Sequence, residues 1–145
     1  MTTVAAILKH KGYQVTTVSP TLSIERVTSV LTEHRIGAVL VVDSTGQLLG
    51  IVSERDIVRC LAANGARTLE MTAGQLMTRA LQVAHPDTTV TEAMARMTIG
   101  RFRHLPVLDR DTLVGLISIG DVVKARIMEQ EGEVDSLKAY VAGSA

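Results

Sequence analysis

The sequence predicts an α/β fold of the α+β kind, in which two β-α-β-β-α units pack together by pseudo-twofold symmetry. The phrase GIVSERDIVRCL at 50–61 returns as GLISIGDVVKAR at 115–126, with Gly, Ser and Asp at one spacing. Further upstream, four residues recur at an offset of 66: Pro20, Thr32, Arg35 and Asp43 match Pro86, Thr98, Arg101 and Asp109. Internal repeats of this kind indicate a duplicated supersecondary unit.

Length and composition limit the alternatives. The 145 residues suffice for one ordinary domain or two very small ones, and 46% of them are hydrophobic. Only Tyr13, Phe102 and Tyr140 are aromatic, so the core has to be aliphatic. Fifteen basic residues balance fifteen acidic ones, which argues against a general polyanion binder.

Each unit is expected to begin with a short strand, at 15–18 and 81–84, followed by a turn that contains Pro20 or Pro86. A helix follows, for which Ser23 and Thr89 are plausible N-caps. Apolar residues at spacings of three and four give each helix one buried face. These residues are Ile24, Val27, Val30 and Leu31 in the first unit and Val90, Ala93, Met94 and Met97 in the second.

A β-hairpin is expected to follow each helix. The repeat slips by one residue where DSTGQLLG faces DRDTLVG, and a hairpin loop tolerates such a length change. The strands are expected at 38–42 with 48–52, and at 104–108 with 113–117. The second helix of each unit then starts at Ser53 or Ser118.

The Ser-x-x-Asp phrases, Ser53 with Asp56 and Ser118 with Asp121, have two interpretations. The first is a helix cap, in which the serine accepts a bond from a first-turn amide and the aspartate reaches back. The second is a ligand site. An ionised carboxylate has two acceptor oxygens, which suit the vicinal hydroxyls of a ribose. The duplication of the phrase favours the ligand site, although a cap alone would explain each copy.

These residues resemble the CBS domain, which occurs in tandem pairs called Bateman modules. The resemblance is carried by the two Gly-h-h-Ser-x-x-Asp phrases, by RHLPVLD at 103–109 and by the β-α-β-β-α order of both copies. It covers almost the whole chain. It implies a first motif with an N-terminal helix at 1–68, a second motif at 69–130 and a helical extension at 131–145.

The resemblance further implies a cleft between the motifs that binds an adenosine-containing ligand, namely AMP, ADP or ATP, or else NADH or S-adenosylmethionine. The aspartates would hold the ribose, and basic side chains would meet phosphate. The implied nucleotide-binding residues are Ser118, Ile119, Gly120, Asp121, Arg101, Arg103, His104, Leu105 and Pro106 in the second copy, and Ser53, Arg55, Asp56, Gly37 and Ala38 in the first.

The two sites are not expected to be equal. Proline lacks an amide and usually marks a strand edge, so Pro106 indicates an edge that opens towards a ligand. Glu54 would repel phosphate, whereas Arg55 could contact it. The site of Asp121 is therefore expected to bind more tightly than the site of Asp56. Lys9, His10 and Lys11 are interpreted as a solvated helix end, with a phosphate contact as the alternative.

Cys60 is the only cysteine, which excludes an intramolecular disulfide and a cysteine metal cluster, and no metal site is expected. The N-terminus is too short and too polar for a signal peptide, and no apolar run approaches the roughly 20 residues of a membrane span. A cytoplasmic protein is expected. A heptad-like stripe favours a homodimer; its members are Val123, Ile127, Gln130, Val134, Leu137 and Val141.

The leading functional hypothesis is a sensor without enzymatic activity, whose ligand state is read by an unknown partner protein. The sequence offers no convincing nucleophile and base. A ligand-free structural adaptor, in which both Ser-x-x-Asp phrases are only caps, stays open as the alternative. A weak nucleic-acid binder also stays open, although few aromatic residues and zero net charge weaken it.

Overall fold

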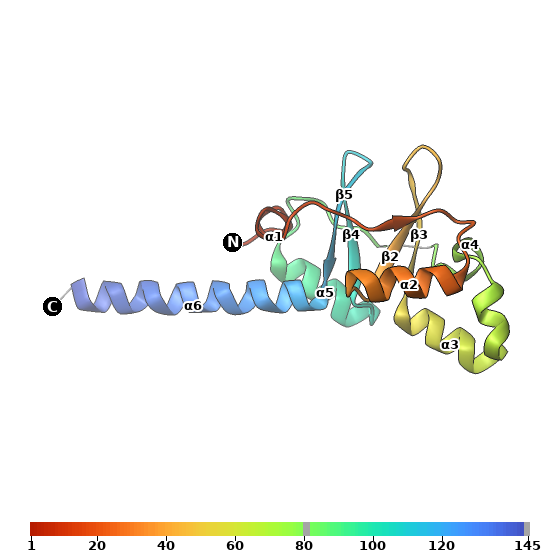
Figure 1. Cartoon of the computed structure of the whole chain (residues 1–145). Coiled ribbons are helices and arrows are strands. Elements are labelled where there is room, and N and C mark those ends of the chain that lie inside the picture. Colours follow the sequence, from red (N-terminus) through yellow and green to blue (C-terminus); the bar gives the residue numbers. More distant parts are fainter. Residues whose placement is uncertain (80–81, 144–145) are drawn as a thin grey trace. The chain divides into compact units, whose positions relative to one another are not determined.

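The computed structural model describes residues 1–79 and 82–143, and it describes side chains as far as residue 132. Helices and strands alternate as the repeat predicts, so the α+β fold is confirmed (Figure 1). In chain order the elements are α1 (Val4–Lys11), β1 (Thr17–Val18), α2 (Ile24–His34), β2 (Ala38–Val42), β3 (Leu48–Ser53), α3 (Glu54–Asn64), the 3₁₀ helix η1 (Gly65–Glu70), α4 (Ala73–Leu76), α5 (Val90–Gly100), β4 (His104–Asp109), β5 (Thr112–Ser118) and α6 (Ile119–Gly143).

The chain forms two compact units. One unit comprises Gln14–Gln82 and Asp111–Leu113 and holds the first repeat. The other comprises Met1–Tyr13, Val83–Arg110 and Val114–Ala145 and holds the second repeat. Each unit has its own cluster of buried aliphatic side chains, as the scarcity of aromatic residues predicts.

The first-repeat unit contains a sheet of strand order β1-β2-β3. Strand β1 runs parallel to β2, and β2 pairs antiparallel with β3 so that Leu40 lies opposite Ile51. Helix α2 packs on this sheet through Ile24, Val27 and Leu31, each of which is less than a tenth exposed. Its predicted cap is confirmed, because the Ser23 hydroxyl accepts a hydrogen bond from the Arg26 N–H at 3.2 Å.

The second-repeat unit is built on the hairpin of β4 and β5, against which α5 buries Val90, Ala93 and Met97. The strand predicted at 81–84 is reduced. Ala84 forms a single parallel bridge with Val107, and residue 81 lies outside the described residues.

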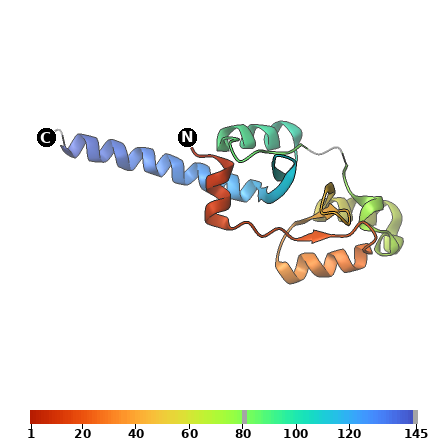
Figure 2. The ribbon, with the colours of Figure 1, turned by 90° about the horizontal axis from the view of Figure 1, so that it is seen from above.

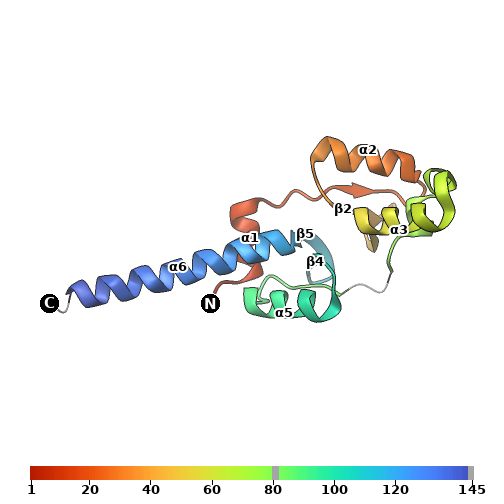
Figure 3. The ribbon, with the colours of Figure 1, turned by 90° about the horizontal axis from the view of Figure 1, so that it is seen from below.

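Helix α1 precedes the first repeat in the chain but lies in the core of the second-repeat unit. Its side chains Val4, Ile7 and Leu8 are buried against residues of α5, β4 and β5. The Val4 N–H also donates to the Thr88 carbonyl at 2.8 Å. Figures 2 and 3 show α1 crossing the beginning of α6, which it contacts. Grouping the N-terminal helix with the first motif at 1–68 therefore follows chain order and not packing.

Helix α4 repeats this arrangement in the first-repeat unit. The Ala73 N–H donates to the Leu22 carbonyl at 2.8 Å, and the Ile24 N–H donates to the Met71 carbonyl at 2.7 Å. Ala73 and Met77 belong to the buried cluster of that unit. Each unit thus combines one repeat with the helix that precedes the other repeat.

The repeated glycine of the two phrases lies where this preceding helix meets the sheet. A Cβ on Gly115 would lie 2.6 Å from Leu8 Cδ2, and a Cβ on Gly50 would lie 2.7 Å from both Met77 Sδ and the Thr78 carbonyl oxygen. Neither distance leaves room for a methyl group. The glycines of the repeated phrase are therefore explained by close packing, independently of any ligand.

Helix α6 continues without a break through Gly132 to Gly143. Val123 and Ile127 are 41% and 50% exposed on it, so the described part of the predicted stripe is open. The side chains of Val134, Leu137 and Val141 lie outside the described residues. Among the helices described, none is long and apolar enough to cross a membrane.

The glycine contacts predict an order of stabilities. Gly50→Ala should lower the free energy of unfolding by about 1–3 kcal/mol, because the Thr78 backbone has to move. Gly115→Ala should cost less, since the obstructing atoms are the ends of the Leu8 side chain. Gly132→Ala is the matched control: no atom lies within 4 Å of its Cβ, and alanine should stabilise the helix by up to about 1 kcal/mol.

Urea unfolding followed by circular dichroism measures all three variants. A Gly50→Ala protein as stable as Gly132→Ala would contradict the packing of α4 on β3.

Candidate functional site

The Ser-x-x-Asp phrase of the first repeat caps helix α3. The Asp56 N–H donates to Ser53 Oγ at 3.3 Å, and the Ser53 N–H donates to Asp56 Oδ2 at 2.9 Å. The Ser53 hydroxyl in turn donates to the same Oδ2 at 2.8 Å. The capping interpretation is therefore confirmed for this phrase.

The phrase of the second repeat caps α6 in the same way. The Asp121 N–H donates to Ser118 Oγ at 3.2 Å, and the Ser118 N–H donates to Asp121 Oδ2 at 2.8 Å. In both repeats the cap engages only Oδ2. Within the described part of the chain, Oδ1 of Asp56 and Oδ1 of Asp121 accept no hydrogen bond, which leaves one carboxylate oxygen for a ligand.

Lys11, at the end of α1, binds Asp121. Its Nζ donates to Asp121 Oδ2 at 2.6 Å and to the Leu116 carbonyl at 2.8 Å. Lys11 is thus an exposed helix end, as predicted, but its ammonium is paired with Asp121. The buried contact of Leu8 with Gly115, one turn earlier, holds Lys11 over the start of α6. Burial by itself would raise the pKa of Asp121, but the bonds from Lys11 and Ser118 outweigh it and hold that pKa below its ordinary value.

Backbone amides next to each aspartate form a second repeated feature. The first helical N–H of α3, from Glu54, donates to the Gly37 carbonyl at 2.9 Å, and that of α6, from Ile119, donates to the Arg103 carbonyl at 2.8 Å. The next N–H, from Arg55 or Gly120, has no partner among the described residues. Each helix start therefore offers one spare donor beside one spare carboxylate oxygen.

The basic residues predicted to clamp an anion are brought only partly towards Asp121. Arg101 ends α5 in the left-handed conformation with φ of 57°, and its counterpart Arg35 ends α2 in the same way with φ of 53°. The side chains of Arg101 and Arg103 are exposed, whereas His104 is half-buried in β4. The backbone of the repeated arginine, Arg35 or Arg101, thus ends its helix, which is a structural role. Arg103 contacts the start of α6 through its carbonyl, which accepts the Ile119 N–H.

Three predicted site residues lie in the core. Leu105 and Ala38 are at most 1% exposed, and Pro106 is buried. The Pro106 carbonyl accepts the Ala84 N–H at 2.8 Å, beside the single bridge of β4 to Ala84. Pro106 therefore lies at a sheet edge, as predicted. That edge is buried, because Ala84 covers it, and Pro106 is not exposed there to a ligand.

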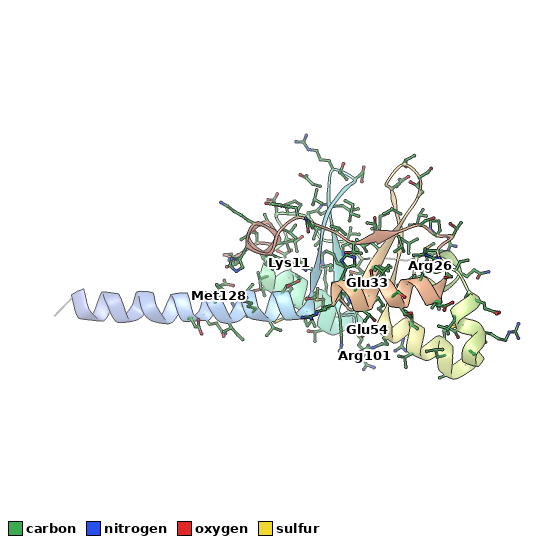
Figure 4. The ribbon with its side chains drawn as sticks, viewed as in Figure 1. Lys11, Arg26, Glu33, Glu54, Arg101 and Met128 are labelled. Atoms are coloured by element: carbon green, nitrogen blue, oxygen red, sulfur yellow. The ribbon has the colours of Figure 1, made fainter. Side chains whose placement is uncertain are left out.

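An open groove of about 550 Å³ runs between α1 and α6 in the second-repeat unit. Its apolar side includes Ile7, Ala125 and Met128, and its polar side includes Lys11 and Asp121 (Lys11 and Met128 are labelled in Figure 4). No local pattern in the sequence predicts this groove, because it depends on the packing of α1 on the second repeat.

Comparison with known proteins identifies the fold. The family model described as CBS domain matches residues 4–63 and 73–128. The mitochondrial CBS domain-containing protein CBSX3 of Arabidopsis thaliana is 38% identical over 117 residues, which are 78% of this chain and 57% of that relative. The chain thus spans little more than half of that relative's length.

Two solved structures extend the comparison. The CBS-domain containing protein ATU1752 from Agrobacterium tumefaciens is 45% identical, with a TM-score of 0.84 over 86% of this chain and 93% of its own. The CBS domain pair of protein MJ0100, solved in complex with 5′-methylthioadenosine and S-adenosyl-L-methionine, is 28% identical, with a TM-score of 0.77 over 90% of this chain and 98% of its own. With both repeats matched by the family model, this chain belongs to the CBS domain family and carries two CBS motifs in tandem.

Proposed function

We propose that the chain is a regulatory module that binds an adenosine-containing ligand, AMP, ADP, ATP or NADH, at Asp56 and Asp121 and transmits its ligand state to a partner protein. One observation carries the proposal: in both repeats the capping aspartate engages Oδ2 and leaves Oδ1 without a partner in the described residues. A cap alone needs only one carboxylate oxygen.

The chemistry of the two helix starts suits a sugar. A ribose presents two adjacent hydroxyls, and each can donate to a carboxylate oxygen and accept from an N–H. Oδ1 of Asp121 with the Gly120 N–H supplies one acceptor and one donor, and Oδ1 of Asp56 with the Arg55 N–H supplies the same pair. Arg101 and Arg103 are two exposed basic side chains of the second repeat that a phosphate could meet.

The relative MJ0100 supports the class of ligand. Its CBS pair was solved with two adenosine derivatives, and it aligns with 90% of this chain. Neither derivative carries phosphate, so S-adenosylmethionine stays among the candidates for this chain beside the nucleotides. These candidate ligands share the adenosine group and differ in their charge.

Ligand binding would be transmitted through the helices that the aspartates begin. Helix α3 starts at Glu54 and α6 at Ile119, so a ligand held at either start bears on a rigid element. Allosteric coupling between two binding sites is typically about 1–3 kcal/mol. We propose no enzymatic step, and the predicted cytoplasmic location stays a prediction.

Calorimetric titration with AMP, ATP, NADH and S-adenosylmethionine tests the ligand site. Asp121→Asn and Asp56→Asn should each weaken binding at their own site by about 10- to 100-fold, because a charged acceptor is lost while an oxygen remains for the cap. Asp87→Asn, an exposed change of the same kind on the loop before α5, should leave binding unchanged.

The other function classes give different outcomes in the same samples. Absence of heat with all four ligands would contradict the proposal and favour the structural adaptor. Release of phosphate from ATP would indicate an enzyme. Binding of an oligonucleotide that survives about 200 mM salt would indicate a nucleic-acid binder, because non-specific phosphate contacts are lost in that range.

The exposed apolar residues of α6 support the proposal of a homodimer. Val123 and Ile127 lie four residues apart on one helix face, and α3 exposes Val58 at 63%. Ile127→Glu should weaken self-association by at least about tenfold, because a dimer contact would bury the charge. Ile99→Glu makes the same change at an 84% exposed position of a different helix, α5, and should leave the dimer intact.

Sedimentation velocity over a range of concentrations measures this equilibrium. A wild-type protein that remains monomeric, or an Ile127→Glu protein that dimerises as the wild type does, would contradict the homodimer on α6.

A further inference from the structure

The two capping carboxylates differ in what donates to them. At Asp56, both donors to Oδ2 come from Ser53, its N–H at 2.9 Å and its hydroxyl at 2.8 Å. At Asp121, the Ser118 N–H donates at 2.8 Å, and the second donor is the Lys11 ammonium at 2.6 Å. Lys11 thus gives Asp121 a charged donor that Asp56 does not have.

The Lys11 contact changes what the Asp121 site offers to a ligand. In both repeats the serine side chain interacts with its own aspartate, Ser53 with Asp56 and Ser118 with Asp121. The Lys11 ammonium has three donors and uses two, on Asp121 and on the Leu116 carbonyl. The Asp121 site therefore presents one donor, the third N–H of Lys11, that the Asp56 site does not present.

The Asp121 site also carries less net negative charge than the Asp56 site. Lys11 compensates Asp121, whereas no described cation pairs with Asp56, and exposed Glu54 lies two residues before it. Lys124 does not explain the difference, because Arg59 holds the matching place in the first repeat.

Lys11 is also within reach of a ligand. Its side chain is 38% exposed, and both Lys11 and Asp121 line the open groove of about 550 Å³ between α1 and α6. Leu8 and Met77 hold corresponding positions, because each packs against the repeated glycine of its unit. Three residues further along the chain, Lys11 therefore corresponds to Ala80, which lies outside the described residues. The first repeat therefore has no lysine to match Lys11 at that position.

We infer that Lys11 determines ligand specificity at the Asp121 site, where it makes the site select phosphorylated adenosine ligands over the unphosphorylated nucleoside. The inference rests on the proposed function, because it needs adenosine to bind at the aspartates. A hydrogen bond from an ammonium to a phosphate oxygen is charge-assisted, so its loss affects a nucleotide and leaves the nucleoside largely untouched.

The test compares AMP with adenosine, which share every group except the phosphate. Calorimetry is done in an Asp56→Asn background, so that the Asp121 site is observed alone. Lys11→Met should weaken AMP by about 10- to 100-fold and change adenosine by less than about threefold. Lys11→Arg should restore most of the AMP affinity. Lys9→Met removes the same charge from an exposed position of α1 and should change neither ligand.

The outcomes separate this inference from the proposed function. Binding of neither AMP nor adenosine to the wild type would refute the proposed function. If the wild type binds both but the Asp56→Asn protein binds neither, or if Lys11→Met weakens AMP and adenosine equally, the role of Lys11 is overturned. Unchanged AMP affinity in Lys11→Met overturns it as well. Should Lys11→Met fail to unfold cooperatively, Lys11→Gln, which keeps a donor for Leu116, is judged by the same criteria.

Discussion

The close approach of α1 to strand β5 underlies both the core and the site of the second-repeat unit. Leu8 can reach the sheet only because residue 115 has no side chain. Once Leu8 is seated there, Lys11 follows one turn later on the same face of the helix and arrives at Asp121 and the Leu116 carbonyl. A glycine in a strand thus determines which cation reaches a carboxylate at the start of the next helix.

The Ser-x-x-Asp phrase serves the fold and remains available for binding at the same time. Capping by Asp56 and Asp121 satisfies amides that would otherwise be unpaired at the helix starts, and it fixes each carboxylate against its own backbone. A fixed carboxylate loses less conformational freedom when a ligand binds than a mobile one does. Capping and ligand binding are therefore compatible, and capping positions Oδ1 in advance.

Much of the fold followed from local signals in the sequence. Ser23 and Thr89 cap their helices, and the hairpins lie within a residue of the predicted ranges, because caps and alternating strands are encoded by adjacent residues. The position of α1 did not follow, since its partner strand is about a hundred residues away in the chain. The role of Lys11 was missed for the same reason. The sequence contains one weak signal that α1 and α4 are equivalent helices. Thr3 and Thr72 are their N-caps and stand at corresponding places before the two repeats.

Each unit contains the helix that precedes the other repeat, and this packing also determines where the protein can be divided. A fragment that ends after the first repeat would carry α1 without β5 and would expose Val4, Ile7 and Leu8 to water. It would also lack α4, so Gly50 would lose its cover. The complementary fragment would have a bare Gly115 strand in the same way. Each half would leave part of a buried cluster uncovered, so a rearrangement of the gene that keeps both cores intact has to carry the leading helices with their sheets.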